Sequence, residues 1–245
     1  MQRVVILGVP IDPVTQDEAL QRISAMLLDK GKHHVMTPNS EMLVAASKDN
    51  TFHSLLQSGE LNLPDSTGLL WAARHTGQFL PERVTGADTV ERLLKSLSSE
   101  DGVFLLGGRK GVGRRASEML QKKNPKLRIV GAYEGSPSQD DAATILEQIN
   151  DSGAHLLLVA YGAPAQDLWI HQYLPSLTSV RVAIGIGGTL DYLSGSLKRA
   201  PLRVRSSGIE WLWRLALQPS RIKRILTAVI VFPFLVMRFG QKTPR

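Results

Sequence analysis

Short apolar runs alternate with longer amphipathic segments along most of the chain. The runs have the length of strands, and apolar residues in the longer segments recur every three to four positions, which is typical of helices packed on one side. The pattern predicts strands at 4–8, 33–37, 61–63, 103–106, 127–133, 155–161 and 180–186. It predicts helices at 15–28, 41–47, 50–57, 66–75, 86–97, 114–123, 139–149 and 165–173.

The strands from residue 103 onward are apolar and alternate with helices. Strands of that kind are buried on both faces, as in a parallel sheet between two layers of helices. We therefore expect an α/β protein with a Rossmann-like, mostly parallel sheet, helices on both of its faces and a helical C-terminal appendage. Such sheets bind ligands at the carboxyl ends of their strands. The residues found there are Thr37, Asn39, Asp65, Gly107, Gly108, Tyr133, Gly162, Gln166 and Gly187–Asp191.

Basic residues are concentrated at the C-terminal end of the 245-residue chain. The net charge is +7, but residues 198–245 hold eleven Lys and Arg and a single acid, Glu210, whereas residues 1–197 have a net charge of −3. This shift in composition predicts a catalytic domain over residues 1–197 and an appendage over residues 198–245. A strongly basic segment implies an anionic partner, such as phosphate, nucleic acid or anionic lipid.

The apolar segments indicate contact with a membrane surface rather than a span. The run Val4–Val9 is too short for a signal peptide. The longest run, Ile225–Met237, has 13 residues, where a spanning helix needs ~20. It is apolar on every side and follows a basic stretch, so we expect it to pack against protein or to lie in the interface of an anionic membrane. No nucleic-acid-binding module is recognisable, which disfavours a nucleic-acid partner.

The spacing of Arg214, Arg221 and Arg224 would place their side chains on one face of a continuous helix. Pro219 lies between them and is expected to begin a new helix at its first turn. The three guanidinium groups can form a solvated basic face or, with so few acids nearby, a site for an anion.

Composition and spacing disfavour metal and disulfide chemistry. The chain has no cysteine, which excludes disulfides and thiolate metal sites and fits a reducing compartment. His33 and His34 are neighbours on a predicted strand, so their side chains point to opposite faces. No spacing typical of metal ligands occurs, and we expect neither a metal nor a cofactor.

A glycine-rich connection, Gly107–Gly113, joins a predicted strand to a helix. Its backbone N–H groups can bind phosphate, or the loop can be a plain turn. Gly111-x-Gly113-x-x-Ala116 matches a relaxed dinucleotide fingerprint, and Glu134 lies about where a ribose-binding acid is found. The first glycine of that fingerprint comes several residues after the strand end. A nicotinamide-dependent oxidoreductase is therefore kept as an alternative only.

Four polar side chains lie where a ligand would bind, and each also has a structural interpretation. Asp65 lies between a strand and a helix, where a helix cap is the favoured interpretation and a general base the alternative. Asn39 has the same ambiguity. Arg83 is the single Lys or Arg in the loop 75–84, where it can be a solvated charge. Gln166 lies one turn into a helix and can face the sheet edge or solvent.

Seven stretches resemble one protein family in both order and spacing, across nearly the whole chain. They are TPNSEML (Thr37–Leu43), LPDSTGLLWAAR (Leu63–Arg74), ERVTGADT (Glu82–Thr89), FLLGG (Phe104–Gly108), YGAPAQDLWI (Tyr161–Ile170), GIGGTLDYLSGSLKRAP (Gly185–Pro201) and GIEWLWRLALQPSRIKR (Gly208–Arg224). The chain resembles the WecG/TagA/CpsF family of bacterial glycosyltransferases. The resemblance implies transfer of an N-acetylmannosamine-type sugar from a UDP-sugar to undecaprenyl-diphosphate-linked N-acetylglucosamine. It also implies inversion at the anomeric carbon, in the synthesis of wall teichoic acid or another surface polysaccharide.

The resemblance implies roles for individual residues as well. Asp65 matches the catalytic base of the family. The residues that match its pocket are Thr37, Asn39, Arg83 and Gln166. The residues that match arginines closing over the pocket and contacting the diphosphate are Arg214, Arg221 and Arg224. The nucleotide is expected at the Gly187–Asp191 turn and the neighbouring strand ends, a set comprising Gly107, Gly108, Gly162, Gly187, Gly188, Thr189 and Asp191.

The implied partners are a UDP-sugar donor, a lipid-diphosphate-linked acceptor and the inner face of the cytoplasmic membrane, to which a cytoplasmic protein would bind peripherally. A homo-oligomer is also implied. Three positions, Ser66, Ala165 and Asp167, depart from the Gly, Lys and Glu that the family commonly has there. These departures leave the donor sugar open. A non-catalytic scaffold for lipid-linked polysaccharide assembly is a further alternative.

Overall fold

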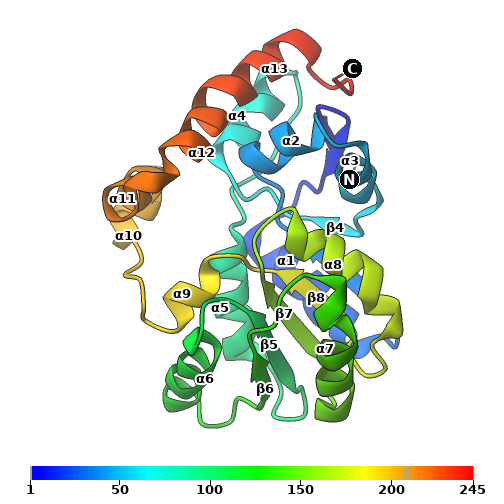
Figure 1. Cartoon of the computed structure of the whole chain (residues 1–245). Coiled ribbons are helices and arrows are strands. Elements are labelled where there is room, and N and C mark those ends of the chain that lie inside the picture. The colour runs from blue at the N-terminus through cyan, green and yellow to red at the C-terminus, as the bar shows by residue number, and fades with distance from the viewer. Residues whose placement is uncertain (1, 207, 209, 245) are drawn as a thin grey trace.

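A six-stranded parallel sheet forms the centre of the protein (Figure 1). The computed structural model describes residues 2–206, 208 and 210–244. The strands follow the spatial order β4-β3-β8-β7-β5-β6. Their bounds are β3 (His33–Met36), β4 (Leu61–Asn62), β5 (Val103–Gly107), β6 (Ile129–Tyr133), β7 (Leu156–Ala160) and β8 (Val182–Gly185). The predicted α/β class is thus confirmed.

Helices cover both faces of the sheet because successive strand residues point to opposite sides. Val103 and Leu105 face one core, built with α1 (Gln16–Leu28), α5 (Gly86–Ser96), α6 (Val112–Lys123) and α9 (Thr189–Leu193). Phe104 and Leu106 face the other core, built with α7 (Gln139–Ser152), α8 (Ala165–Tyr173) and the short 3₁₀ turn η1 (Leu174–Ser176). This two-sided burial explains why the strands are apolar throughout.

A third apolar core lies beyond the β4 edge, where a hairpin meets α2 (Ser40–Ala46), α3 (Asn50–Ser58) and α4 (Thr67–His75). The single strand predicted at 4–8 is wrong: the chain forms β1 (Val4–Ile6) and β2 (Val9–Ile11), which pair antiparallel. Leu7 and Gly8 form the turn between them, with φ of 50° and 78°. Two successive positive φ values are typical of tight hairpin turns. Such turns usually have the sequence Asn-Gly or Asp-Gly, and because Leu7 takes the first position here, the sequence does not predict the hairpin.

The C-terminal helical segment runs from the flank of the molecule to its top, orange to red in Figure 1. It comprises α10 (Leu202–Ser206), α11 (Glu210–Leu217), the 3₁₀ turn η2 (Pro219–Arg221), α12 (Ile222–Leu226), the π-helical turn η3 (Thr227–Val231) and α13 (Phe232–Phe239). Pro219 begins a new helical turn, as predicted. The N–H groups of Leu7 and Gly8 donate to the carbonyls of Gly240 and Gln241, at 3.0 Å each, and so fix the end of the segment to the hairpin.

The apolar run Ile225–Met237 has two different faces. Phe232 and Val236 are 0% and 1% exposed and belong to the third core, whereas Ile230, Phe234 and Met237 are 60%, 57% and 61% exposed. The run therefore packs against protein along one side and leaves an apolar side uncovered. No helix within residues 2–206, 208 and 210–244 is long and apolar enough to cross a membrane.

The docking of α13 gives a stability prediction. Phe232→Ala is expected to lower the free energy of unfolding by ~3–5 kcal/mol, because it removes a buried aromatic ring and leaves a cavity in the third core. Phe234→Ala is the matched control and is expected to change it by less than ~1 kcal/mol, since that ring is mostly exposed. Urea unfolding followed by far-UV circular dichroism measures both. Equal effects of the two substitutions would contradict this packing.

Candidate active site

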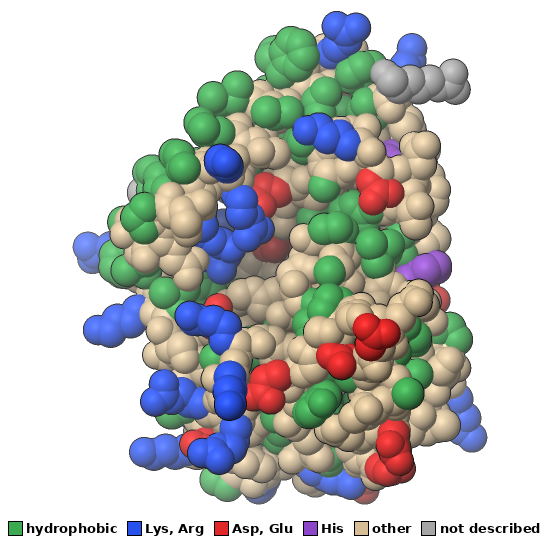
Figure 2. Space-filling model, in the orientation of Figure 1, with side chains coloured by type: hydrophobic (Ala, Val, Ile, Leu, Met, Phe, Trp, Pro, Cys, Tyr) green, Lys and Arg blue, Asp and Glu red, His purple; other side chains and the backbone are tan. Residues whose placement is uncertain are grey.

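A cleft of about 280 Å³ lies between the carboxyl ends of the strands and the C-terminal helical segment. Figure 2 shows a hollow in this part of the surface, with Lys and Arg side chains gathered along its rim. Twelve of the predicted site residues line the cleft. They are Thr37, Asn39, Asp65, Arg83, Gly162, Gln166, Gly187, Gly188, Thr189, Arg214, Arg221 and Arg224.

Asp65 follows β4 and is not the helix cap that its position favoured. Ser66 caps α4, because its side chain accepts from the Leu69 N–H. The Asp65 N–H donates to the Pro38 carbonyl at 3.1 Å, and its carboxylate accepts from the Gly86 N–H at 3.3 Å. The carboxylate is thus held at the first turn of α5, facing the cleft.

The surroundings of Asp65 raise its pKa to about 7. Burial among protein atoms is the largest cause. The Arg83 guanidinium and the Gly86 N–H lower the pKa, the Glu210 carboxylate raises it and Arg214 lowers it. A carboxylate with a pKa near neutrality can accept and release a proton at physiological pH, as a general base must.

Gly86, the first residue of α5, lies against Thr37, and its N–H reaches Asp65. A Cβ on Gly86 would lie 2.9 Å from the Thr37 methyl group, so a larger residue there would displace the helix start. Thr37 itself directly follows β3 and is 7% exposed. Asn39 caps α2, accepting from the Met42 N–H at 3.1 Å, so its cap interpretation is confirmed while its side chain still lines the cleft.

Gln166 ties together the turns that follow β7 and β8. It is 4% exposed, and its Oε1 accepts from the N–H groups of Gly162 and Gly187 at 3.1 and 2.9 Å. Its side chain therefore faces the sheet edge rather than solvent. Asp167, the neighbouring departure from the family pattern, is buried with its carboxylate 3.6 Å from His34.

The arginines reach the cleft from three different elements. Arg214 lies on α11 with its guanidinium 5.2 Å from the centre of the Tyr192 ring, Arg221 ends η2 and Arg224 lies on α12. They do not share one continuous helix, because the chain breaks before Pro219, but the fold still brings them to one cavity. Arg224 also pairs with Glu41 at 2.6 Å.

Burial and neighbouring positive charges together change the acid–base properties of one arginine. Burial, Arg214 and Arg224 lower the pKa of Arg221 to about 10, with burial the largest cause. Like charges held together in this way repel one another, and an anionic ligand between them would relieve the repulsion. The cleft therefore combines the Asp65 carboxylate with three arginines close enough to repel one another.

The expected nucleotide set divides between the cleft and a neighbouring depression of about 370 Å³. Gly108 and Asp191 line only the depression, while Gly162, Gly187 and Gly188 line both cavities. Asp191 pairs there with Arg109 at 3.0 Å. Gly107 ends β5, and a Cβ on it would lie 2.9 Å from the Tyr161 ring.

The glycine-rich loop Gly107–Gly113, on which the oxidoreductase alternative depends, is hydrogen-bonded to Glu134. The Glu134 carboxylate accepts from the Gly111 N–H at 2.7 Å, so it holds the loop in place instead of facing a ribose. The helix begins at Val112, two residues before its predicted start. The geometry of this loop therefore does not support a dinucleotide site.

Sequence reasoning missed several residues of the site. Glu210, Tyr192, Gly86 and Trp211 all line the cleft. For Glu210 a signal existed, since it is the single acid of residues 198–245. For Gly86 and Tyr192 the role depends on contacts between distant segments, which no local pattern reveals.

Comparison with known proteins shows the family to which the chain belongs. Residues 4–245 match the glycosyl transferase WecG/TagA/CpsF family. The chain is 33% identical over 194 residues to an N-acetylglucosaminyldiphosphoundecaprenol N-acetyl-beta-D-mannosaminyltransferase of Bacillus subtilis (strain 168), covering 79% of this chain and 75% of that protein. It is 27% identical over 243 residues to a protein of the same name from Staphylococcus aureus (strain MRSA252), covering 98% and 94%. The chain therefore belongs to the WecG/TagA/CpsF family of glycosyltransferases.

Proposed function

We propose that this protein transfers an N-acetylmannosamine-type sugar from a UDP-sugar to undecaprenyl-diphosphate-linked N-acetylglucosamine, with inversion and without a metal ion. The names of its relatives support the acceptor and the sugar. The observation that carries the proposal is the cleft itself. It holds one carboxylate whose pKa is about 7 opposite three arginines.

Asp65 is the base in this scheme. It takes the proton of an acceptor hydroxyl while that oxygen forms a bond to the anomeric carbon of the donor. The bond between the anomeric carbon and the diphosphate breaks, and UDP leaves with the electron pair. A single attack from the face opposite the leaving group inverts the configuration, so one base is sufficient.

Arg214, Arg221 and Arg224 are proposed to hold diphosphate and to stabilise the charge that develops on the leaving group. Planar guanidinium groups donate paired hydrogen bonds to phosphate oxygens. Preorganised positive charge in a partly buried site is an effective way to stabilise such a leaving group. With these groups supplying the charge, we expect transfer to persist in the presence of EDTA.

The nucleotide is proposed to occupy the turn from Gly187 to Thr189 and the adjoining depression. Gly162 and Gly187 have φ of 80° and 44°, and these turns lie at the carboxyl ends of β7 and β8, where parallel sheets bind ligands. The ion pair between Arg109 and Asp191 borders the same depression.

The C-terminal part of the chain is proposed to meet the membrane that carries the lipid acceptor. The division at residue 198 into a catalytic domain and an appendage is part of this proposal. The exposed apolar side of α13 supports it, with Phe234 and Met237 at 57% and 61% exposed and basic residues on either side. Binding would be peripheral, at the inner face of the cytoplasmic membrane. Self-association stays a prediction from the family resemblance.

The raised pKa of Asp65 predicts the pH dependence. Activity should require the ionised carboxylate, so kcat/KM should fall as the pH is lowered through about 7. A pH–rate profile measured between pH 5 and pH 9 gives the apparent pKa of this acid limb. A limb near the ordinary Asp pKa of ~4 would contradict the assignment.

Ligand binding separates the proposal from the oxidoreductase alternative. UDP is expected to raise the melting temperature of the protein, and NAD is expected to leave it unchanged. A product whose anomeric linkage is β, formed from an α-linked UDP-sugar and identified by NMR, would establish inversion. Stabilisation by NAD and not by UDP would favour the alternative.

A further inference from the structure

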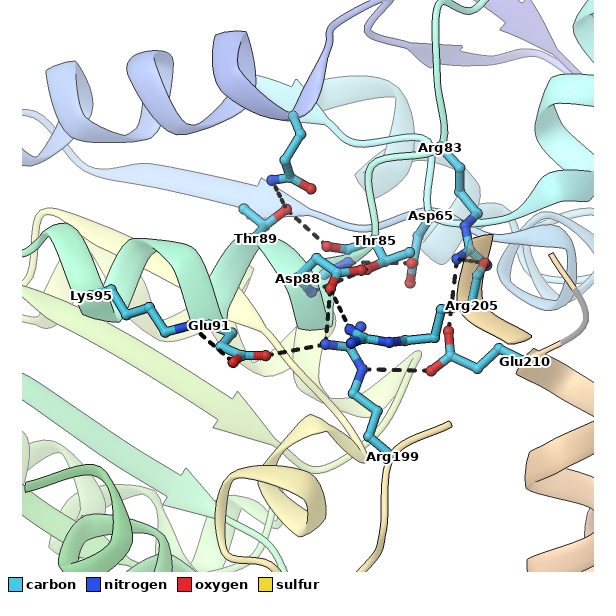
Figure 3. Close-up of polar contacts among 12 residues, drawn as sticks. Asp65, Arg83, Thr85, Asp88, Thr89, Glu91, Lys95, Arg199, Arg205 and Glu210 are labelled. Carbon is cyan, nitrogen blue, oxygen red and sulfur yellow. Dashed lines mark hydrogen bonds and ion pairs between the residues drawn. The ribbon is translucent and has the colours of Figure 1, made fainter. Parts of the chain in front are cut away.

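Glu210 is an acidic residue in the otherwise basic C-terminal segment, and it is paired with two arginines. It is the single acid among residues 198–245 and begins α11, where the helix dipole favours a negative charge. Its side chain is 15% exposed, with Oε2 3.8 Å from Arg83 Nη2 and Oε1 3.6 Å from Arg199 Nε. Figure 3 shows the Arg83 guanidinium directed toward Glu210, with Asp65 to one side of it.

An ion-pair network fixes Glu210 in this position. Arg199 also pairs with Asp88 at 2.9 Å and with Glu91 at 3.3 Å, both on α5. Arg205 pairs with the same Asp88 oxygen at 3.0 Å (Figure 3). The network thus joins α5, whose first N–H holds Asp65, to the segment that carries Glu210.

Arg83 has two acidic neighbours and is paired with one of them. Both Arg83 and Glu210 act on the charge of Asp65, and Arg83 is the larger influence of the two. Among the residues that the structure describes, Glu210 is the one carboxylate paired with Arg83. The same Nη2 donates to the Arg205 carbonyl at 3.0 Å. Were Arg83 to pair with Asp65 instead, the carboxylate would become a much weaker base, since such a pair lowers an Asp pKa by ~1–3 units.

We propose that Glu210 is a positioning residue of the transfer reaction, drawing the Arg83 guanidinium away from the Asp65 carboxylate and leaving that carboxylate free to accept the acceptor's proton. The inference rests on the proposed function, because it assigns Asp65 the role of base. In this arrangement the strength of Asp65 as a base depends on the position of α11, which carries Glu210. The Asp65 carboxylate would then be a sufficiently strong base only when the C-terminal helical segment lies against the sheet edge.

The charged groups around both carboxylates agree with this role. Asp65 is faced by Arg83 from the loop before α5, by the Gly86 N–H of α5 and by Glu210 and Arg214 from α11. Glu210 is faced by Arg83, Arg199 and the Tyr192 hydroxyl, whose pKa burial raises first and Glu210 raises further. Removing the Glu210 charge lowers the proton affinity of Asp65 directly, and freeing Arg83 lowers it again. Both effects have the same sign.

The test compares Glu210→Gln with Glu91→Gln. Glu91 binds the same Arg199 but does not line the cleft, so it is a matched control. Glu210→Gln is expected to shift the acid limb of the pH–rate profile down by at least ~0.5 unit. It should also lower kcat on the alkaline plateau by ~3- to 10-fold, because a weaker base transfers a proton less effectively. KM should change less than twofold, and Glu91→Gln should leave the limb in place.

A carboxyl ¹³C NMR titration makes the result independent of activity. The Asp65 resonance is assigned as the one missing in Asp65→Asn, and its pKa should be lower in Glu210→Gln than in the wild type. Glu210→Asp, with a carboxylate one methylene shorter, should shift the pKa in the same direction by less. If Glu210→Gln does not fold, the Asp65 pKa measured in Glu210→Asp decides whether Glu210 controls the proton affinity of Asp65.

An Asp65 pKa at or above the wild-type value in these variants would overturn the inference. A uniform loss of kcat with an unmoved acid limb would also overturn it, since that is the result of a purely structural role. If the wild type transfers no sugar from any UDP-sugar, the proposed function fails separately. The titration still decides whether Glu210 controls the proton affinity of Asp65.

Discussion

Asp65→Asn is expected to lower kcat by ~10²–10⁴-fold, the usual contribution of a general base. The amide has the size of the carboxylate and can still accept from the Gly86 N–H, but it cannot take up a proton from the acceptor hydroxyl. KM for the donor should change little, because the arginines and the glycine turns that are proposed to bind it are untouched. Steady-state kinetics at pH 8 measures both constants.

The same substitution should not destabilise the protein, which separates a catalytic role from a structural one. The folded-state pKa of Asp65 is raised above the ordinary value, so folding loses stability as the pH rises through the range from ~4 to about 7. At pH 8, Asp65→Asn is therefore expected to unfold at the same urea concentration as the wild type or at a higher one. Asp17→Asn is the control, since Asp17 lies on the surface paired with Arg92. Retention of more than about a tenth of wild-type kcat in folded Asp65→Asn would contradict the role of base.

Arg221→Gln is expected to reduce kcat/KM by ~10²–10³-fold, the size of effect seen when one preorganised donor to a developing negative charge is removed. Burial is the largest cause that lowers the pKa of Arg221 to about 10, and the like charges of Arg214 and Arg224 lower it further. A positive charge held near other positive charges is energetically unfavourable until an anion binds to it. The loss should therefore be accompanied by equal or greater stability of the ligand-free protein.

Lys223→Gln provides the matched control for Arg221. Lys223 lies in the next turn, on α12, but does not line the cleft. Lys223→Gln should lower kcat/KM by less than ~threefold. Arg221→Gln, in contrast, should also weaken the binding of UDP measured by calorimetry. Similar losses from the two substitutions would indicate a general effect of net charge and not a diphosphate site.

The fold was predictable largely because the alternation of apolar strands with helices imposes one architecture. Residues such as Val103 to Leu106 have no polar side, which leaves a sheet covered on both faces as the stable arrangement. The hairpin at Leu7 and Gly8 was not predictable in this way. Its turn depends on a leucine held at positive φ by the C-terminal residues that hydrogen-bond to it.

The site was predictable in its location and less so in its contacts. Strand ends and the resemblance pointed to Asp65, yet local position favoured a cap, and Ser66 takes that role instead. The contact that orients Asp65 comes from Gly86, 21 residues away in the sequence. The pairing of Arg83 with Glu210 joins residues separated by more than half the chain, so it follows from tertiary packing alone.

The most direct test of the proposed function is a transfer assay with a short-chain analogue of undecaprenyl-diphosphate-linked N-acetylglucosamine and a panel of UDP-sugars, read by mass spectrometry. The wild type is expected to add one N-acetylhexosamine, fastest from UDP-N-acetylmannosamine, with EDTA present. Asp65→Asn, folded and still able to bind UDP, is expected to form almost none of that product. No product from any UDP-sugar, or equal product from the wild type and Asp65→Asn, would contradict the proposed function.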